Sequence, residues 1–433
     1  MLRWVRGGNC RQQLPGDQRE ATTAAAGDGK NFNFRACAVD FDARPNPLQC
    51  RPSQLADSSN ALLRIVQNAM PTALLTGFPG FLASAFLPDF LSRTDPQTRV
   101  TCLVQSHFRP MAEERAKKIA AMHPEWTGRI QLVEGDITHP ELDLKEGAKE
   151  LQADTREVYH FAAIYDLAVP RPLGMRINVA GTAHVLDFIE ACPAFDRLHY
   201  VSTCYVSGRH PGVFSERDLR MGQRFNNYYE ETKYLAEVEV QERMKKGLSA
   251  TIYRPSIVVG DSKTGETQKY DGPYGALRWL VSWKSVAPMS IIGDPRKFHV
   301  NFAPRDFVVA ALSRLSALPQ SRGKVYQLCD PHPPTVEEIY EIFSKATGRR
   351  VLRIPSWAPL MKGMLRMLPA AARSSHITPE SIDYFTHPTE YTCENTLADL
   401  SGTGLCCPRF SDYAPVLVRF MQEHPEVSDK AMH

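Results

Sequence analysis

The stretch TALLTGFPGFLA, residues 72–83, decides the fold. Its first five residues form a short apolar run typical of a buried strand, and residues 80–92 have the apolar spacing of an amphipathic helix. Gly77 permits a tight turn, Gly80 lets a pyrophosphate approach the backbone, and small Ala83 allows close packing of helix on sheet. A turn without any ligand is the alternative for this motif alone. Its place between a strand and a helix favours a pyrophosphate at the helix N-terminus, where free N–H groups attract an anion.

Strands and helices continue to alternate after this motif. We expect further strands at 100–104, 129–135, 157–163, 197–208 and 249–260, and helices at 110–123, 175–192 and 227–246. This alternation predicts an α/β fold, a Rossmann-type doubly wound parallel sheet with its nucleotide site at the carboxyl ends of the strands.

We divide the chain into three parts on this basis. Residues 70–261 form the NAD(P)-binding domain, and 262–433, richer in proline and irregular segments, form a smaller substrate-binding portion. Two patterns stand out in that portion: Thr335 and Glu338 make a capping box, and KVYQLCD (324–330) is an open candidate for a strand returning to the main sheet.

Residues 1–69 show no sustained period of 2 or 3.6 and mix Arg, Gln, Gly, Ala and Pro, which is typical of disorder. A transit peptide is one alternative, although serine is scarce and acids are present. We favour an over-extended translation start, with Met70 as initiator, and expect no catalytic role for 1–69.

Composition limits the function further. The 433 residues are 43% hydrophobic and 23% charged, with a net charge of +3, so we expect no nucleic-acid partner. No run of 18 apolar residues occurs, so we expect no membrane-spanning helix. The ten cysteines include no CxxC pair, which disfavours a metal site and favours reduced thiols in a cytoplasmic protein.

A candidate catalytic pair lies on the predicted helix 227–246. Tyr229 and Lys233 are four residues apart and share one helix face. A phenol has a pKa of about 10, and a neighbouring ammonium favours the phenolate and lowers that pKa. Alone, this pair would be an ordinary solvated helix face. Thr203 strengthens the case because it ends a strand at the cofactor mouth, although strand packing explains a threonine equally well.

The end of the second strand bears on the choice of cofactor. An NAD site usually carries an acid there, but the sequence is QSHFR, residues 105–109. Arg109 can instead pair with a 2′-phosphate, and the alternative is a solvated surface arginine. We expect NADP (NADPH) rather than NAD.

These pieces together resemble the extended short-chain dehydrogenase/reductase family. The matching segments are TGFPGFLA, VEGDI (133–137), YHFAAIYD (159–166), NVAGT (178–182), YVSTCYV (200–206), YEETK (229–233) and YRPSIVVGD (253–261). They occur in the family's order and cover most of 70–261. HYVSTCYVSG, ETKYLAE and YRPSIVVGDSKTGE look most like the male-sterility or thioester-reductase branch, which includes fatty acyl-CoA reductases.

The resemblance implies roles for individual residues. Thr203, Tyr229 and Lys233 would be the catalytic hydroxyl, the proton donor and its activating lysine, and Asn178 a structural or proton-relay residue. Tyr165 and Tyr205 would line the substrate, although aromatic packing explains Tyr205 equally well. The cofactor would contact Gly77, Phe78, Gly80, Phe81, Leu82, Arg109, Asp136, Ile137, Ala162, Ala163, Tyr229, Lys233, Pro255, Ser256 and Ile257.

The implied reaction is NADPH-dependent reduction of an acyl thioester, either acyl-CoA or carrier-bound, to an aldehyde or alcohol. Two alternatives stay open: a ketone or hydroxysteroid-type dehydrogenase or nucleotide-sugar epimerase of the same family, and a non-enzymatic dinucleotide sensor. Retention of all three catalytic residues argues against the sensor, and 261–433 shows no obvious cluster for a nucleoside diphosphate. Segment 356–373 is apolar and basic, which suits a lid helix or, as a lesser alternative, peripheral contact with a membrane.

Overall fold

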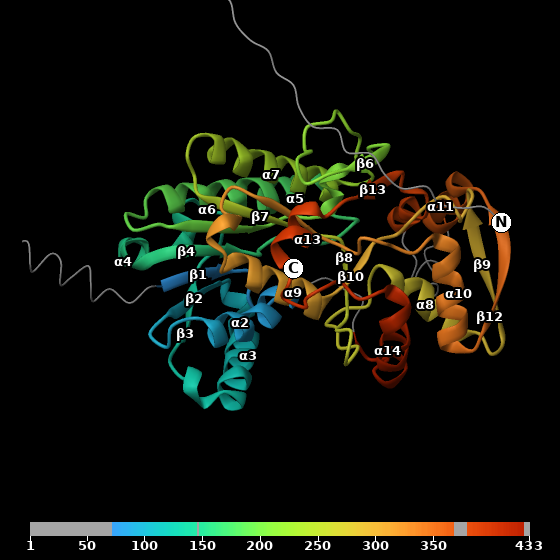
Figure 1. Cartoon of the computed structure of the whole chain (residues 1–433), viewed down its shortest axis with the longest axis horizontal. Coiled ribbons are helices and arrows are strands. Elements are labelled where there is room, and N and C mark those ends of the chain that lie inside the picture. Colours follow the sequence, from blue (N-terminus) through green and yellow to red (C-terminus); the bar gives the residue numbers. More distant parts are fainter. Residues whose placement is uncertain (1–71, 145–146, 368–378, 428–433) are drawn as a thin grey trace, which may run out of the picture. The chain divides into compact units, whose positions relative to one another are not determined.

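The structure, a computed structural model, describes residues 72–144, 147–367 and 379–427 (Figure 1). All of them belong to one structural unit, Arg64–His433. The predictions for residues 1–69, and the end of segment 356–373, fall outside the described residues. No helix in the described ranges is long and apolar enough to cross a membrane.

The centre of the fold is a seven-stranded sheet in the order β11-β7-β5-β4-β1-β2-β3, with every neighbouring pair parallel. The predicted doubly wound α/β fold is confirmed. Because the connections turn in opposite directions on either side of β1, a switch point lies there, where such sheets bind nucleotides. The strands are β1 (Thr72–Thr76), β2 (Arg99–Val104), β3 (Ile130–Glu134), β4 (Thr155–His160), β5 (Arg197–Val201), β7 (Ala250–Pro255) and β11 (Val325–Leu328).

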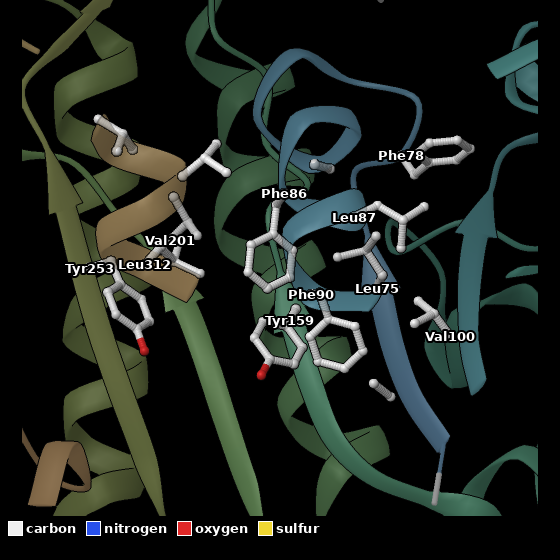
Figure 2. Packing of buried hydrophobic residues seen from close by; sticks show 14 of the residues in the cluster. Leu75, Phe78, Phe86, Leu87, Phe90, Val100, Tyr159, Val201, Tyr253 and Leu312 are labelled. Atoms are coloured by element: carbon white, nitrogen blue, oxygen red, sulfur yellow. The ribbon is translucent and has the colours of Figure 1, made fainter. Parts of the chain in front are cut away.

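Helices cover both faces of this sheet (Figure 1). Alternate strand residues point to opposite faces, so Leu75 packs under α2 and α9 whereas Leu74 packs under α6 and α7. Figure 2 shows the first face, where Phe86 and Phe90 of α2 surround Tyr159, with ring centroids 4.9 and 5.1 Å away. The helices are α2 (Phe81–Arg93), α3 (Arg109–Met122), α4 (Ala148–Asp154), α5 (Arg171–Gly174), the π-helical turn η4 (Met175–Ala180), α6 (Gly181–Glu190), α7 (Tyr228–Lys245) and α9 (Arg305–Ser316).

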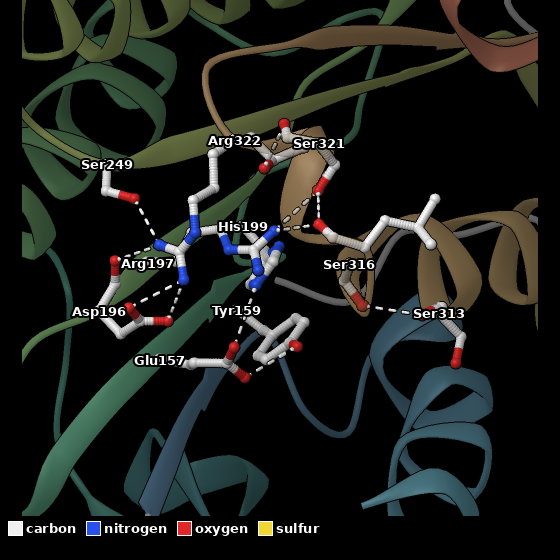
Figure 3. Close-up of polar contacts among 12 residues, drawn as sticks. Glu157, Tyr159, Asp196, Arg197, His199, Ser249, Ser313, Ser316, Ser321 and Arg322 are labelled. Atoms are coloured by element: carbon white, nitrogen blue, oxygen red, sulfur yellow. Dashed lines mark hydrogen bonds and ion pairs between the residues drawn. The ribbon is translucent and has the colours of Figure 1, made fainter. Parts of the chain in front are cut away.

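The same face also carries a buried polar network, drawn in Figure 3. Arg197 of β5 donates to the carbonyl of Leu318 at 3.1 Å and to Ser321 Oγ at 2.7 Å. Two residues along β5, His199 lies 3.0 Å from the Tyr253 hydroxyl and 3.8 Å from Glu157. Burial lowers the pKa of His199, which Glu157 opposes. Arg197 therefore fastens the segment after α9 to the sheet, whereas His199, Tyr253 and Glu157 link three neighbouring strands.

Residues of the C-terminal half pack in the hydrophobic core of the main sheet and in a second hydrophobic core. Strand β11 of this half pairs in parallel with β7, so the segment left open in the sequence does return to the main sheet. The second core joins α8, β9, β10, α10 and α14. The predicted capping box is present, since Thr335 Oγ1 accepts from the Glu338 N–H at 3.2 Å and Glu338 accepts from the Thr335 N–H at 2.7 Å.

The remaining elements lie on both sides of residue 262, and their strands pair as β8 with β10, β9 with β12 and β6 with β13. They are β6 (Gly212–Phe214), β8 (Ile257–Val259), α8 (Pro273–Ser282), β9 (Val286–Ile292), β10 (Phe302–Pro304), α10 (Val336–Thr347), β12 (Arg350–Ser356), α11 (Ala358–Met367), β13 (Thr389–Tyr391), α13 (Glu394–Leu400) and α14 (Phe410–Glu423). The 3-10 segments are η1 (Ser106–Phe108), η2 (Pro124–Trp126), η3 (Pro140–Asp143), η5 (Cys204–Ser207), η6 (Pro319–Ser321) and η7 (Pro379–Thr386).

Candidate active site

A cavity of about 690 Å³ lies at the carboxyl ends of the central strands. It brings most of the sequence-predicted site residues together. Its described lining does not include Arg109. The predicted residues that line it are Gly77, Phe78, Gly80, Phe81, Leu82, Asp136, Ile137, Ala162, Ala163, Tyr165, Thr203, Tyr205, Tyr229, Lys233, Pro255, Ser256 and Ile257.

The turn between β1 and α2 is built so that only glycine fits at two positions. Gly77 has φ +88°, and a Cβ there would lie 2.7 Å from the backbone nitrogen of Ala162. A Cβ on Gly80 would lie 2.6 Å from the carbonyl oxygen of Gly77, which accepts the Gly80 N–H at 2.7 Å. No side chain caps α2, so the first-turn N–H groups suit an anion.

The ends of β2 and β3 shape a neighbouring part of the same cavity. Asp136 accepts hydrogen bonds from Gln105 Nε2 and from the Thr138 N–H, each at 2.8 Å. Burial works to raise the pKa of Asp136, but these hydrogen bonds outweigh it and hold the pKa below its ordinary value. The carboxylate is therefore ionised and fixed in direction at the cavity.

Two arginines of α3 lie nearby. Arg109 pairs with Glu113 at 3.0 Å and Glu134 at 3.4 Å, and its side chain is 38% exposed. A role on a 2′-phosphate, which stays a prediction, requires Arg109 to exchange these carboxylates for the phosphate. Arg115, which sequence reasoning missed, donates to the carbonyl of Pro79 and, at 3.1 Å, to Ser84 Oγ. It braces the phosphate turn from the outside, and no sequence pattern pointed to it.

The catalytic pair lies at the start of α7. Asn227 caps this helix, since its Oδ1 accepts the Glu230 N–H at 3.0 Å. Tyr229 and Lys233 are both buried on the face toward the cavity. Lys233 Nζ donates to the carbonyl of Val201 at 2.8 Å and to the Tyr200 hydroxyl at 3.2 Å.

The electrostatics of this pair correct one sequence-based expectation. Burial raises the pKa of Tyr229 above its ordinary value, and a hydrogen bond with Thr203 opposes this. Glu230 and Asp271 add to the rise, and the Lys233 ammonium donates to Val201 and Tyr200. Burial lowers the pKa of Lys233 to about 8, against the attraction of Glu237. Tyr229 is therefore protonated at neutral pH.

Buried polar groups hold the catalytic segments from behind. Ser202, the neighbour of Thr203, donates to Glu237 at 2.5 Å, and Arg254 pairs with the same carboxylate at 2.6 Å. Both members of this ion pair are fully buried. Asn178 accepts the Ile164 N–H at 2.9 Å and donates to Thr232 at 3.0 Å. Of the two roles left open for Asn178, these bonds fit the structural one.

The far side of the cavity is largely aromatic. Tyr165 lies edge-on to Tyr229, with ring centroids 5.1 Å apart, and Lys269 lies over the Tyr165 ring while pairing with Asp271 at 2.9 Å. Sequence analysis predicted Tyr165 and Tyr205 as substrate-lining residues and assigned the rest of this side to 262–433, without identifying individual residues there. Besides Lys269 and Asp271, that half contributes Phe302, Tyr340, Phe343, Tyr384 and Phe385.

Metal and disulfide chemistry find no support in the part of the chain that the structure describes. It contains no group of three or more His, Cys, Asp or Glu side chains arranged to hold a metal ion. The cysteines within the described ranges are all free thiols.

Known proteins share this arrangement. A family model described as male sterility protein matches residues 75–312, more than half of the chain. The large chain of L-2-aminoadipate reductase from Penicillium chrysogenum is 30% identical over 285 residues, 61% of this chain and 20% of that protein. A component of linear gramicidin synthase from Brevibacillus parabrevis is 28% identical over 277 residues, 62% of this chain and 5% of that protein. The chain thus spans a minor part of each of these relatives.

Among solved structures, the terminal R domain from the myxalamid PKS-NRPS biosynthetic pathway is similar at 27% identity and a TM-score of 0.68. The match covers 84% of this chain and 93% of that domain. The likeness therefore extends beyond the sheet into the C-terminal half.

Proposed function

This chain belongs to the male sterility protein family, in the thioester-reductase branch of the extended short-chain dehydrogenases/reductases, and we propose that it uses NADPH to reduce an acyl thioester to an aldehyde or alcohol. One observation carries the proposal. A single cavity is lined by a glycine-dependent phosphate turn and by Thr203, Tyr229 and Lys233.

The cofactor half of the cavity fits a nicotinamide dinucleotide, because Gly77 and Gly80 permit a turn too tight for any side chain, and this turn leads into the uncapped N-terminus of α2. When bound, this cofactor supplies the hydride. We assign its pyrophosphate to the N-terminus of α2. The other contacts of the proposal are Asp136 and Ile137 for adenine, Ala162 and Ala163 for the nicotinamide ribose, and Pro255, Ser256 and Ile257 along the nicotinamide.

The protein's own groups handle the carbonyl oxygen and the proton. Tyr229 donates a hydrogen bond to the thioester carbonyl and then its proton, since its raised pKa keeps the phenol protonated. Thr203 donates the second hydrogen bond to the same oxygen. Cleavage of the C–S bond in the resulting hemithioacetal releases a thiol and leaves an aldehyde, which a second hydride reduces to an alcohol.

Lys233 holds the ribose and supports Tyr229. Its ammonium has three donors, and the bonds to Val201 and Tyr200 use two of them. The third is available for a ribose hydroxyl. With a pKa of about 8 it is charged at neutral pH, so it stabilises the phenolate after proton transfer.

The relatives support a thioester as substrate. Two are a reductase of L-2-aminoadipate and a component of linear gramicidin synthase, and the similar solved structure is the terminal R domain of a PKS-NRPS pathway. We propose an acyl-CoA or a carrier-bound thioester as the substrate here, and the cytoplasm as the compartment, where the free thiols would stay reduced.

The decisive experiment follows NADPH oxidation and products with long-chain acyl-CoA, a ketone panel or UDP-sugars. Aldehyde or alcohol from acyl-CoA supports the proposal. Turnover of ketones or UDP-sugars alone would reassign the chain to another activity of the extended family. Cofactor binding without any turnover would make it a dinucleotide sensor.

The surface of α11 supports a secondary proposal of peripheral membrane contact. Met361 and Leu365 pack inward with Ile382, so one face is that of a lid helix. On the other face Leu360 is 68% exposed and Met364 53%, and such an apolar face suits an interfacial helix. Co-sedimentation with anionic vesicles tests it, and equal recovery of wild type and Leu360→Glu would remove the proposal.

A further inference from the structure

Glu230 directly follows Tyr229 on α7, and nothing in the proposed chemistry uses it. Its side chain is fully buried. The carboxylate accepts hydrogen bonds from the Asn226 N–H at 2.8 Å, from Asn226 Nδ2 at 3.0 Å and from the Tyr384 hydroxyl at 2.7 Å. Burial of a carboxyl among neutral donors is costly, and the pKa of Glu230 is raised to about 7.

Tyr384 comes from η7, 154 residues further along the chain. Its hydroxyl also receives a hydrogen bond from Asn227 Nδ2 at 3.1 Å, and Asn227 is the cap of α7 that accepts the Glu230 N–H. The first turn of the catalytic helix and η7 thus share a closed set of hydrogen bonds.

The Tyr384 ring lines the cavity. It lies edge-on to Tyr205, with ring centroids 5.0 Å apart, and Tyr205 follows Thr203 by two residues. Tyr384 therefore touches the start of α7 through its hydroxyl and the segment after β5 through its ring. Its neighbour Asp383 is anchored separately, by Lys362 of α11 at 2.5 Å.

We propose that Glu230 and Tyr384 are positioning residues that seat η7 as the acyl-facing wall of the cavity, so that the acyl group is held with its carbonyl at Thr203 and Tyr229. This inference rests on the proposed thioester reduction. It makes Tyr384 a determinant of acyl binding, whereas the cofactor is held by the opposite wall.

The test compares Tyr384→Phe, which keeps the ring and loses the hydroxyl, with Glu230→Gln. Each variant raises the KM for dodecanoyl-CoA by about tenfold, the effect of losing a hydrogen bond to a charged group. The kcat changes by less than about threefold, and the KM for NADPH stays at the wild-type value. The double variant is no worse than either single variant, because both break one contact.

Matched controls come from the same helix. Tyr228→Phe changes a half-exposed tyrosine one position before the catalytic one, and Glu231→Gln changes a carboxylate paired with Arg171 at the surface. Both keep the wild-type KM. A wild-type KM for dodecanoyl-CoA in Tyr384→Phe and Glu230→Gln would overturn the inference. An equal rise in the KM for dodecanoyl-CoA and the KM for NADPH would also overturn it.

A second readout needs no substrate. Amide hydrogen exchange of residues 379–386 is faster in Tyr384→Phe and Glu230→Gln than in wild type and the two controls. If wild type turns over no acyl-CoA, the proposed function fails while exchange still tests the anchor. Unchanged amide exchange of residues 379–386 in both variants would overturn the proposed anchor. If Glu230→Gln does not fold, the exchange of Tyr384→Phe alone tests the anchor.

Discussion

The two walls of the cavity are built by different means. The cofactor wall depends on backbone: Gly77 and Gly80 adopt positions where any side chain would collide with backbone atoms. The substrate wall depends on side chains such as Phe302, Tyr340 and Tyr384, which come from β10, α10 and η7. A wall of backbone atoms suits the pyrophosphate that every dinucleotide contains. A wall of side chains can change by substitution to fit a different acyl group. The reaction type and the substrate choice are therefore separable in this fold.

The largest expected effect on kcat comes from substituting Tyr229, which lies between the cofactor wall and the substrate wall. Tyr229→Phe deletes the proton donor and should lower kcat by about 10²- to 10⁴-fold. The dissociation constant for NADPH should stay near the wild-type value, because the phenol is not needed to hold the cofactor. Stopped-flow hydride transfer and fluorescence titration measure the two quantities, with Tyr228→Phe as control; a kcat unchanged by the substitution would remove Tyr229 from the mechanism.

Gly77→Ala tests the backbone wall. The new Cβ combines a left-handed backbone with a close approach to the Ala162 nitrogen, and NADPH affinity should fall by about a hundredfold. Gly128→Ala is the matched control, because Gly128 has φ +80° but nothing within 4 Å of a new Cβ. Equal NADPH affinities in these two variants would mean that the turn does not bind the pyrophosphate.

Glu230→Gln tests the buried contact between α7 and η7 through the pH dependence of the free energy of unfolding. Burial, reinforced by Asp383, raises the pKa of Glu230 to about 7, against hydrogen bonds from Asn226 and Tyr384. The folded chain therefore holds a proton that the unfolded chain has released, and the stability from this group is lost as pH rises toward and through 7.

Glu230→Gln lacks this titration, so its unfolding free energy should gain about 2 kcal/mol on wild type between pH 5 and pH 8. Urea unfolding at a series of pH values measures the difference. Parallel curves for the two proteins would show that Glu230 has an ordinary pKa in the fold.

Arg109→Ala has the smallest expected effect, and it tests whether the cofactor wall distinguishes NADPH from NADH. Losing a pairing with the 2′-phosphate should weaken NADPH by about tenfold and leave NADH nearly unchanged. Lys118→Ala, on the same helix and paired with Glu114 at 2.7 Å on the surface, is the control. An equal loss for both cofactors would exclude the 2′-phosphate role.

Much of the cofactor wall was predictable because its signals are local. TALLTGFPGFLA (72–83) indicated the strand, the turn and the helix, and the structure contains all three. The family resemblance, carried by motifs within residues 70–261, was confirmed over 75–312. The lining of one cavity by Thr203, Tyr229 and Lys233 follows from helix spacing and from the common edge of parallel strands.

The sequence by itself thus determined the fold class and the tight turn after β1, since periodicity and backbone freedom act over a few residues, and it predicted Thr203, Tyr229 and Lys233 as the catalytic side chains. Only the tertiary structure decided which partners those side chains have. Arg109 pairs with Glu113 and Glu134, Lys233 donates hydrogen bonds to Val201 and Tyr200, and Glu230 accepts one from Tyr384. Such pairings join segments up to 154 residues apart, and they depend on how the whole chain packs rather than on any local pattern.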